Sequence, residues 1–217
     1  MDRWATFDCY GTLVDWNAGI GAELERVVGG ERAGLLARYH ELEPRVQAGE
    51  PGLSYRQVMR RVQAALARER GTTVSDVDAD ALARSLPAWP VFPEVPPALA
   101  EMRRRGWRLA ILSNTDRDFI EASKVQIGVP FDETIVASEV GSYKPALGHW
   151  RAFESAVGRM PDVHVGASHF HDVVPANGLG LLTVWVNRLG EHGDPQPTRE
   201  ITDLAPLPDT LDELVPA

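Results

Sequence analysis

The residues with the clearest chemical potential lie near the start of the sequence, in the run FDCYGTL at positions 7–13. An apolar segment at positions 4–7 predicts a buried strand, and Gly11 with Thr12 predicts a tight turn directly after it. Asp8 is therefore expected at the carboxyl end of a strand, where open α/β sheets bind their ligands. A carboxylate placed there could face a bound ligand, or it could be an ordinary acidic residue before a turn.

Cys9 is the one cysteine of the chain and stands beside this carboxylate. Because side chains alternate along a strand, Cys9 should point away from the side to which Asp8 points. We therefore interpret Cys9 as a small buried filler rather than as a nucleophile. A single cysteine forms no disulfide within the chain, which favours a cytoplasmic protein.

Two further groups of polar residues follow predicted strands. Positions 107–112 predict a buried strand, which delivers Ser113 and Asn114 just before a helix. Hydroxyl and amide groups at a helix N-terminus can cradle an anion, and they can equally form a plain N-cap. Positions 133–138 predict another strand, after which Lys144 stands at a turn before a proline, either as a site residue or as an exposed turn lysine.

A fourth predicted strand, at positions 164–168, leads into His169, His171 and Asp172, and a fifth is expected at positions 182–186. Two histidines two residues apart beside a carboxylate could suggest a metal site. No further histidine or cysteine falls at a spacing that would support such a site, so we predict no metal there.

Between the first and second predicted strands the pattern becomes helical, because apolar residues recur at helical spacing between glycine and proline residues. The expected helices cover positions 15–28, 32–43, 55–70 and 81–86. Pro44 is expected to interrupt the second of them. The sequence thus predicts an α/β core with a parallel sheet, formed by residues 1–14 and 91–217, and a helical insert at residues 15–90.

The composition limits the kinds of partner. The chain has 217 residues, of which 44% are hydrophobic and 24% charged, and its formal net charge is −9. This is an ordinary globular composition, and the negative charge argues against nucleic acid and anionic membrane surfaces as partners. A small anionic substrate stays compatible, because a local arginine or lysine can dominate a pocket. No apolar run is long enough to span a bilayer.

The motifs described above occur in an ordered series. Asp-x-Tyr-Gly-Thr-Leu at positions 8–13, Ser-Asn at 113–114, Tyr-Lys-Pro at 143–145 and the acidic Asp172 resemble the four motifs of the haloacid dehalogenase (HAD) superfamily. The first motif resembles type II 2-haloacid dehalogenases more closely than phosphatases. The resemblance implies a Rossmann-like α/β core with a parallel sheet and a helical cap inserted after the first strand.

The resemblance also implies catalytic roles. Asp8 would be the nucleophile, and Lys144 would steady its charge. Asp172 would be the acid of the fourth motif. Thr12 would orient the nucleophile, and Ser113 would hold the substrate carboxylate.

Two further residues are implied to meet the departing halide. One is Asn114, next to the serine of the second motif. The string LARYHELE at positions 36–43 resembles the stretch that holds the cap arginine, which makes Arg38 the second. Arg38 could instead be a solvated helix residue, and Arg45 and Arg56 are other candidates nearby.

Tyr10 distinguishes two reaction types within this superfamily. In HAD phosphatases its place holds a second aspartate that protonates the leaving alkoxide, whereas a halide leaves as a stable anion and needs no proton. Tyr10 therefore favours chemistry at a carbon–halogen bond and is expected to line the apolar wall of the pocket. Ala167 stands where phosphatases usually carry a carboxylate that supports Mg²⁺, so we predict neither a metal nor another cofactor.

The fourth motif departs from the dehalogenase pattern. Ala167, His169 and His171 stand where well-known members carry serine, asparagine and tryptophan, of which the first two help to place the hydrolytic water. We hypothesise that His169 or His171 fills this gap, as a water-orienting group or as a halide donor.

The sequence therefore predicts a metal-independent hydrolase that cleaves the carbon–halogen bond of a small 2-haloacid through an aspartyl ester. Three alternatives stay open. They are a Mg²⁺-dependent HAD phosphatase with an atypical first motif, a non-catalytic protein that binds a small acid or a protein partner, and a hydrolase of a strained ring or another activated carbon. A homodimer is a family-level expectation.

Overall fold

The computed structural model describes residues 2–217, and its centre is a six-stranded parallel sheet in the order β3-β2-β1-β4-β5-β6. The strands are β1 (Arg3–Phe7), β2 (Trp107–Ser113), β3 (Glu133–Val136), β4 (Val163–Gly166), β5 (Leu182–Val186) and β6 (Arg199–Ile201). Because β1 lies between β2 and β4, the segments that follow these three strands emerge side by side at one edge of the sheet. This confirms the predicted α/β class.

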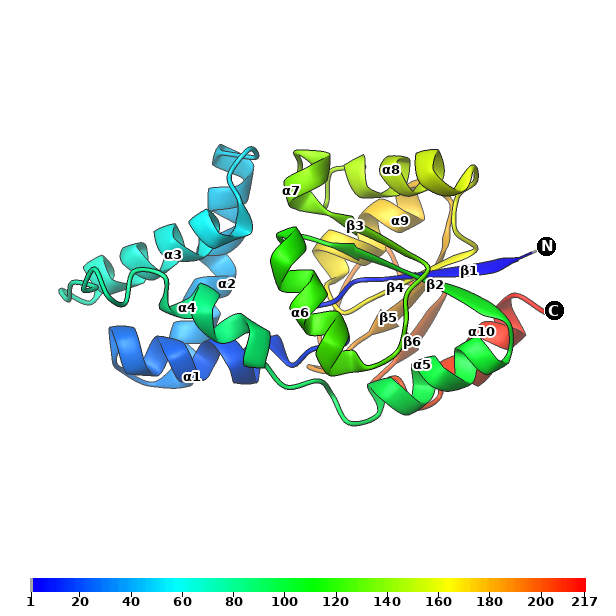
Figure 1. The fold of residues 1–217 in the computed structure, drawn as a ribbon, viewed down its shortest axis with the longest axis horizontal. Helices are drawn as coiled ribbons and strands as arrows, with labels where there is room; N and C mark the ends of the chain where they lie inside the picture. The colour runs from blue at the N-terminus through cyan, green and yellow to red at the C-terminus, as the bar shows by residue number, and fades with distance from the viewer. Residues whose placement is uncertain (1) are drawn as a thin grey trace.

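Helices cover both faces of the sheet (Figure 1). Along β2, Leu109 and Ile111 belong to one apolar cluster, and Ala110 and Leu112 belong to the other. This alternation explains why the strand is apolar along most of its length, since each face must be buried beneath helices. The helices of the core are α5 (Val95–Arg104), α6 (Arg117–Ile127), α7 (Ala137–Val140), α8 (Gly148–Val157), α9 (Val174–Gly178) and α10 (Leu207–Leu214).

A second group of helices lies beside the core, at the left of Figure 1. It comprises α1 (Trp16–Val28), α2 (Arg32–Gly49), α3 (Tyr55–Glu69), α4 (Ala81–Ser85) and the short η1 (Leu86–Ala88), all within the predicted insert. The expectation that Pro44 interrupts the second helix is wrong, because α2 continues through it to Gly49. A proline inside a helix removes one N–H donor, here the one that would serve the carbonyl of His40, but tertiary packing can hold the helix together.

The cap helices are fastened to the core by Asp116, at the start of α6. Its carboxylate accepts hydrogen bonds from the backbone N–H groups of Tyr55 (2.8 Å) and Arg56 (3.0 Å), at the N-terminus of α3. Tyr143 adds a hydrogen bond from its hydroxyl to the carbonyl of Leu53 (2.8 Å). Asp116 therefore satisfies the free donors of a cap helix, and the position of the cap over the sheet depends on these contacts.

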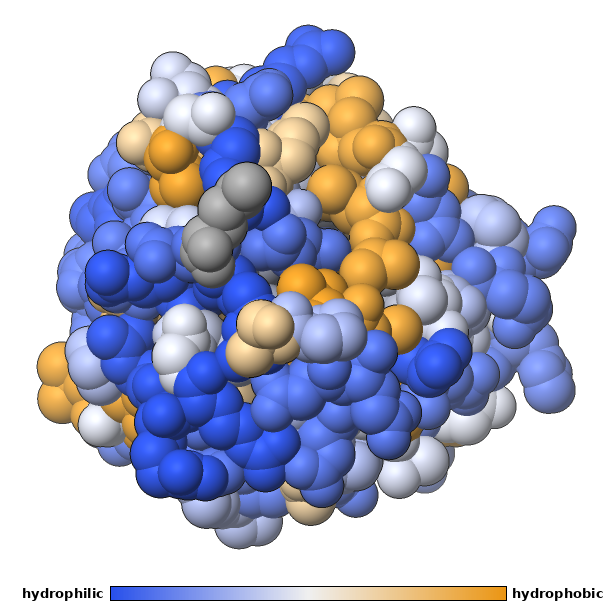
Figure 2. Space-filling view, turned by 90° about the vertical axis from the view of Figure 1, so that its right-hand side faces the viewer, coloured by the Kyte–Doolittle hydropathy of each residue, from blue (hydrophilic) through white to orange (hydrophobic). Residues whose placement is uncertain are grey.

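The C-terminal segment completes the sheet. The three residues Arg199–Ile201 form β6, which pairs in parallel with β5 and adds a strand that the sequence pattern did not predict. Figure 2 views the end of the molecule that carries both termini, where a mainly hydrophilic surface is crossed by a band of hydrophobic residues. No helix within residues 2–217 is long and apolar enough to cross a membrane.

Candidate active site

Asp8 lies directly after β1 and is held on several sides. Its backbone N–H donates to the carbonyl of Val165 on β4 (2.9 Å). One carboxylate oxygen accepts a hydrogen bond from the Lys144 ammonium (3.0 Å), and the other accepts one from the Thr12 hydroxyl (2.9 Å). The Thr12 hydroxyl in turn accepts from the backbone N–H of Ala167 (2.9 Å). The tight turn at Gly11, where φ is +93°, allows Thr12 to reach back to the carboxylate.

Lys144 is shared between two carboxylates. Besides Asp8, its ammonium donates to Asp172 at 2.5 Å, and only 1% of the lysine side chain is exposed. The side-chain amide of Asn114 fixes the lysine backbone from both sides, accepting from its N–H (2.6 Å) and donating to its carbonyl (3.0 Å). Asn114 therefore positions the loop that carries the lysine.

Asp172 is anchored by a second set of donors. It accepts from the backbone N–H of Ser168 (3.1 Å) and lies 3.3 Å from the Nε2 of His164 on β4. Because an ionised carboxylate only accepts hydrogen bonds, the proton of the His164 ring must lie on Nε2. The other ring nitrogen lies 2.9 Å from the Thr6 hydroxyl, which also lies within hydrogen-bond distance of the Val163 carbonyl (3.2 Å).

Two buried carboxylates thus compete for one ammonium. Burial alone would raise the pKa of Asp172, but Lys144 and His164 together hold it well below its usual range. For Asp8 the balance is opposite: burial raises its pKa above the ordinary value, Lys144 offsets only part of this, and the charge of Asp172 raises it further. Although burial opposes its charge, the two carboxylates raise the pKa of Lys144. Of these two carboxylates, Asp8 is therefore the one whose ionised form is less stabilised.

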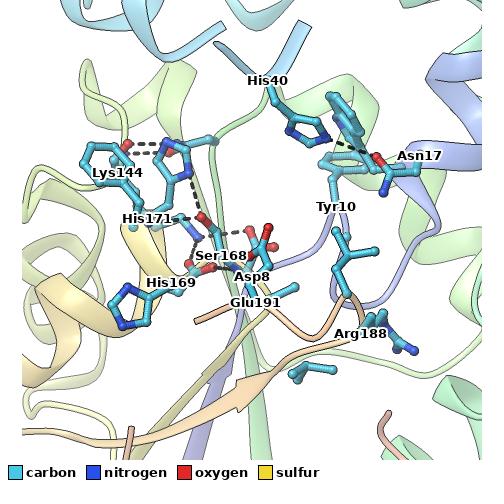
Figure 3. A pocket seen from close by; sticks show the side chains of 18 of the residues that line it. Asp8, Tyr10, Asn17, His40, Lys144, Ser168, His169, His171, Arg188 and Glu191 are labelled. Atoms are coloured by element: carbon cyan, nitrogen blue, oxygen red, sulfur yellow. Dashed lines mark hydrogen bonds and ion pairs between the residues drawn. The ribbon is translucent and has the colours of Figure 1, made fainter. Parts of the chain in front are cut away.

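These groups open onto a cavity of about 1180 Å³ between the core and the cap helices (Figure 3). Ser113, at the end of β2, lines this cavity. Its hydroxyl is buried and finds no hydrogen-bond partner among residues 2–217. A hydroxyl in this state is available to a ligand that enters the cavity, because an unsatisfied buried polar group is costly.

Tyr10 also lines the cavity, with its polar end turned aside. Its hydroxyl pairs with the Ser123 hydroxyl (3.0 Å), and its ring lies edge-on to Trp89 with ring centres 5.9 Å apart. It therefore offers mainly aromatic surface. Cys9 is buried, as expected, and burial raises the pKa of its thiol well above the ordinary value, so it stays protonated.

The placement of Arg38 differs from the prediction. Arg38 lies at the surface of α2, where its guanidinium pairs with Glu69 (2.7 Å) and with Glu41, and it is not among the cavity-lining residues. The reason is helical phase: the cavity side of α2 carries His40, Glu43, Pro44 and Gln47, which share one helix face. Arg38 precedes His40 by two positions, about 200° around the helix, and so faces outward.

The two histidines of the fourth motif have different environments. His169 stacks against Trp185 with ring centres 5.0 Å apart, its Nε2 meets the carbonyl of Pro195 (2.9 Å), and its ring is directed away from Asp8 (Figure 3). His171 instead bonds the Ser168 hydroxyl through Nδ1 (3.0 Å). Across residues 2–217, no three His, Cys, Asp or Glu residues are grouped so as to hold a metal ion.

Sequence reasoning missed several residues of the cavity. The cap contributes Glu43, whose carboxylate accepts from the Tyr55 hydroxyl (2.8 Å), and burial raises the pKa of Glu43 to about 7. Ser168 and His164, which hold Asp172 in place, were also not singled out. The helical spacing from His40 to Glu43 indicates a shared face, but a single sequence does not say which face meets the cavity.

Comparisons with known proteins agree with this architecture. A family model described as haloacid dehalogenase-like hydrolase matches residues 3–169. The chain therefore belongs to the haloacid dehalogenase-like hydrolase family. This confirms the resemblance deduced from the four motifs.

Individual relatives refine this picture. The chain is 33% identical to a (S)-2-haloacid dehalogenase from Pseudomonas sp. (strain YL), across 91% of this chain and 89% of that protein. It is also 33% identical to a phosphoserine phosphatase from Thermus thermophilus, but across only 57% and 51% of the two chains. The L-2-haloacid dehalogenase from Xanthobacter autotrophicus with covalently bound chloropropionic acid shares the fold, with a TM-score of 0.85, 20% identity and coverage of 97% and 98%.

Thr12 provides a test of how Asp8 is kept ionised. The Thr12 hydroxyl donates to the charged form, so Thr12→Val should raise the pKa of Asp8. Thr12→Ser keeps the hydroxyl and is the matched control. The measurement is a pH titration of the Asp8 carboxyl carbon by NMR, assigned with Asp8→Asn. An Asp8 pKa unchanged in Thr12→Val would contradict the described geometry.

Arg38 provides a test of the corrected cap geometry. Arg38→Gln should leave the turnover of an anionic substrate and the thermal unfolding midpoint nearly unchanged, because its partners are surface carboxylates. Steady-state kinetics and a thermal melt of both proteins measure this. A large rise in KM with an unchanged melt would mean that Arg38 reaches the substrate after all.

Proposed function

We propose that this hydrolase cleaves the carbon–halogen bond of a small 2-haloacid without a metal ion, using Asp8 as a covalent nucleophile. The observation that carries the proposal is the setting of Asp8, between Lys144 and Thr12 at the floor of the cavity. Tyr10 strengthens it, because it places an aromatic surface where a phosphatase needs a proton donor.

The first half-reaction is an in-line displacement. A carboxylate oxygen of Asp8 attacks the carbon that bears the halogen, an ester bond forms, and the halide departs with the electron pair of the broken bond. The Lys144 ammonium keeps the Asp8 carboxylate ionised. The buried Ser113 hydroxyl donates a hydrogen bond to the substrate carboxylate. No proton transfer is needed in this step, because a halide is a stable anion.

The second half-reaction releases the product. Water attacks the carbonyl carbon of the Asp8 ester, so the bond between that carbon and the substrate oxygen breaks and a 2-hydroxy acid leaves. One proton of the water ends on the product oxygen as its hydroxyl hydrogen, the other passes to solvent, and the carboxylate of Asp8 is restored. The Thr12 hydroxyl and the Lys144 ammonium, which bond the carboxylate oxygens, are placed to stabilise the negative charge that develops there.

A phosphatase is the second candidate, because one relative over about half the chain is a phosphoserine phosphatase. Such an enzyme needs Mg²⁺ beside the nucleophile. The residues here do not fit that ion: the Lys144 ammonium already lies on oxygens of Asp8 and Asp172, Ala167 offers no side-chain oxygen, and the Tyr10 hydroxyl is turned to Ser123. These features favour carbon–halogen cleavage over phosphate transfer.

The substrate, the cellular location and the oligomeric state of the enzyme follow from the same proposal. Its partner is a small anionic organic substrate, bound in the cavity beneath the cap. A cytoplasmic location is supported by the single buried cysteine, which needs no oxidising compartment. A homodimer stays a prediction from the family resemblance.

The substrate class is tested by halide release from (S)-2-chloropropionate, with EDTA present and absent. We expect EDTA-resistant release of chloride and no phosphate release from para-nitrophenyl phosphate with Mg²⁺. Asp8→Asn should abolish chloride release without lowering the unfolding midpoint, because burial of the ionised Asp8 carboxylate is itself unfavourable. Mg²⁺-dependent phosphate release, or chloride release by Asp8→Asn, would contradict the proposal.

A further inference from the structure

The chain passes twice between the core and the cap, through two linkers at residues 13–15 and 89–94, and these linkers are joined to each other. The backbone N–H of Asp15 donates to the carbonyl of Pro90 (2.7 Å), and a second hydrogen bond of 3.1 Å runs in the opposite direction. An antiparallel bridge lies between the two bonds. The position of the cap relative to the core therefore depends on this short ladder.

One side chain of the core, Arg188 in the loop after β5, reaches the ends of both linkers. Its terminal nitrogen Nη2 donates to the carbonyl of Thr12, directly before the first linker (3.0 Å), and to the carboxylate of Glu94, at the end of the second (2.6 Å). Its guanidinium carbon lies 3.6 Å from the centre of the Phe92 ring. A planar guanidinium that is stacked on a ring and bonded to two oxygens has little freedom to move.

The orientation of Arg188 is set by these contacts and not by its remaining donors. Its Nε is buried and has no hydrogen-bond partner within residues 2–217. An unpaired buried donor is unfavourable, so the contacts to Thr12 and Glu94 outweigh it. The loop is itself fixed, because the side-chain amide of the preceding Asn187 donates to the carboxylate of Glu200 on β6 (2.7 Å). Arg188 therefore acts from a fixed point of the core.

Thr12 connects Arg188 to the chemistry. Among residues 2–217, the carbonyl of Thr12 accepts a hydrogen bond from Arg188 alone. The hydroxyl of Thr12 donates to Asp8 and accepts from the backbone N–H of Ala167. A shift of the Thr12 backbone would therefore move its hydroxyl away from the Asp8 carboxylate. Arg188 also lines the cavity onto which Asp8 opens (Figure 3).

We propose that Arg188 is a positioning residue for the nucleophile, which holds the Thr12 carbonyl against the second linker and so keeps the Thr12 hydroxyl on Asp8. The inference rests on the proposed function and adds to it a residue that does not touch the reacting atoms. Arg188 transfers no proton and forms no bond with the substrate. Without it, the ionised form of Asp8 loses the hydrogen bond from Thr12, so the pKa of Asp8 rises.

Arg188→Met tests this role, because it keeps apolar contact with the Phe92 ring and removes both hydrogen bonds. The pKa of Asp8, measured by NMR titration of its carboxyl carbon, should rise, as it should in Thr12→Val. The kcat for chloride release from (S)-2-chloropropionate should fall about tenfold or more with KM little changed, because the nucleophile is misplaced. Since the ionised Asp8 is the reactive form, the acid limb of the kcat profile should move to higher pH.

A double variant separates positioning from a general loss of structure. If Arg188 acts through Thr12, adding Arg188→Met to Thr12→Val should change the pKa of Asp8 and kcat little further, because the hydroxyl is already absent. Glu94→Gln is the matched control. Its amide oxygen still accepts from Arg188, so Arg188 stays on Thr12 and the pKa of Asp8 should equal that of wild type.

Three results would overturn the inference. The first is an Arg188→Met protein with the wild-type pKa of Asp8 and the wild-type kcat. The second is full additivity of Arg188→Met and Thr12→Val. The third is a rise in KM with kcat unchanged, which would show that the unpaired Nε of Arg188 binds the substrate instead.

Circular dichroism and the unfolding midpoint must accompany each variant. Where Arg188→Met does not fold, Arg188→Lys takes its place, because it keeps the charge but replaces the rigid planar fork by a flexible ammonium. It should raise the pKa of Asp8 partway, and a wild-type value would overturn the inference. The NMR titration needs no turnover, so absence of chloride release by wild-type protein would overturn the proposed function and leave the positioning of Asp8 by Arg188 still measurable.

Discussion

The site depends on one buried lysine that serves two carboxylates. The Lys144 ammonium lies 2.5 Å from Asp172 and 3.0 Å from Asp8, with nearly no exposure to water. Asp172 is further secured by His164 and Ser168, and so it stays ionised and keeps the lysine in place. Asp8 makes the longer of the two hydrogen bonds with the Lys144 ammonium, so its negative charge is less well stabilised than that of Asp172. That is a suitable state for a nucleophile.

The sheet order makes this arrangement possible. Asp8 follows β1, Ser113 ends β2 and Asp172 follows β4, and these three strands are neighbours in the sheet. Lys144 lies in the loop that follows β3 and the short helix α7. The side chain of Asn114 holds the backbone of Lys144 with two hydrogen bonds. Asp116 helps to hold the cap over the cavity, because its carboxylate binds the N-terminus of α3. Chemistry and cap attachment therefore share the same edge of the sheet.

The sequence was most informative where backbone pattern and chemistry coincide. Apolar strands that end in Ser113 or lead into Asp8 and Asp172 were recognisable because strand ends converge in a parallel sheet. The expected place of Arg38 was wrong because a short string does not define which face of a helix meets the cavity. Pro44 was expected to break α2, but packing overrode local propensity. The contacts of Ser168 and the sharing of Lys144 depend on three-dimensional distances that no sequence spacing encodes.

The central claim is that Asp8 itself becomes esterified. A single turnover of (S)-2-chloropropionate with excess enzyme in ¹⁸O-labelled water tests it most directly. The peptide that contains Asp8 is then isolated and its mass measured. The account predicts that this peptide gains one heavy oxygen while the hydroxyl of the product stays unlabelled, because water attacks the Asp8 ester. A heavy oxygen in the product hydroxyl and none in the peptide would show that water attacks the substrate directly.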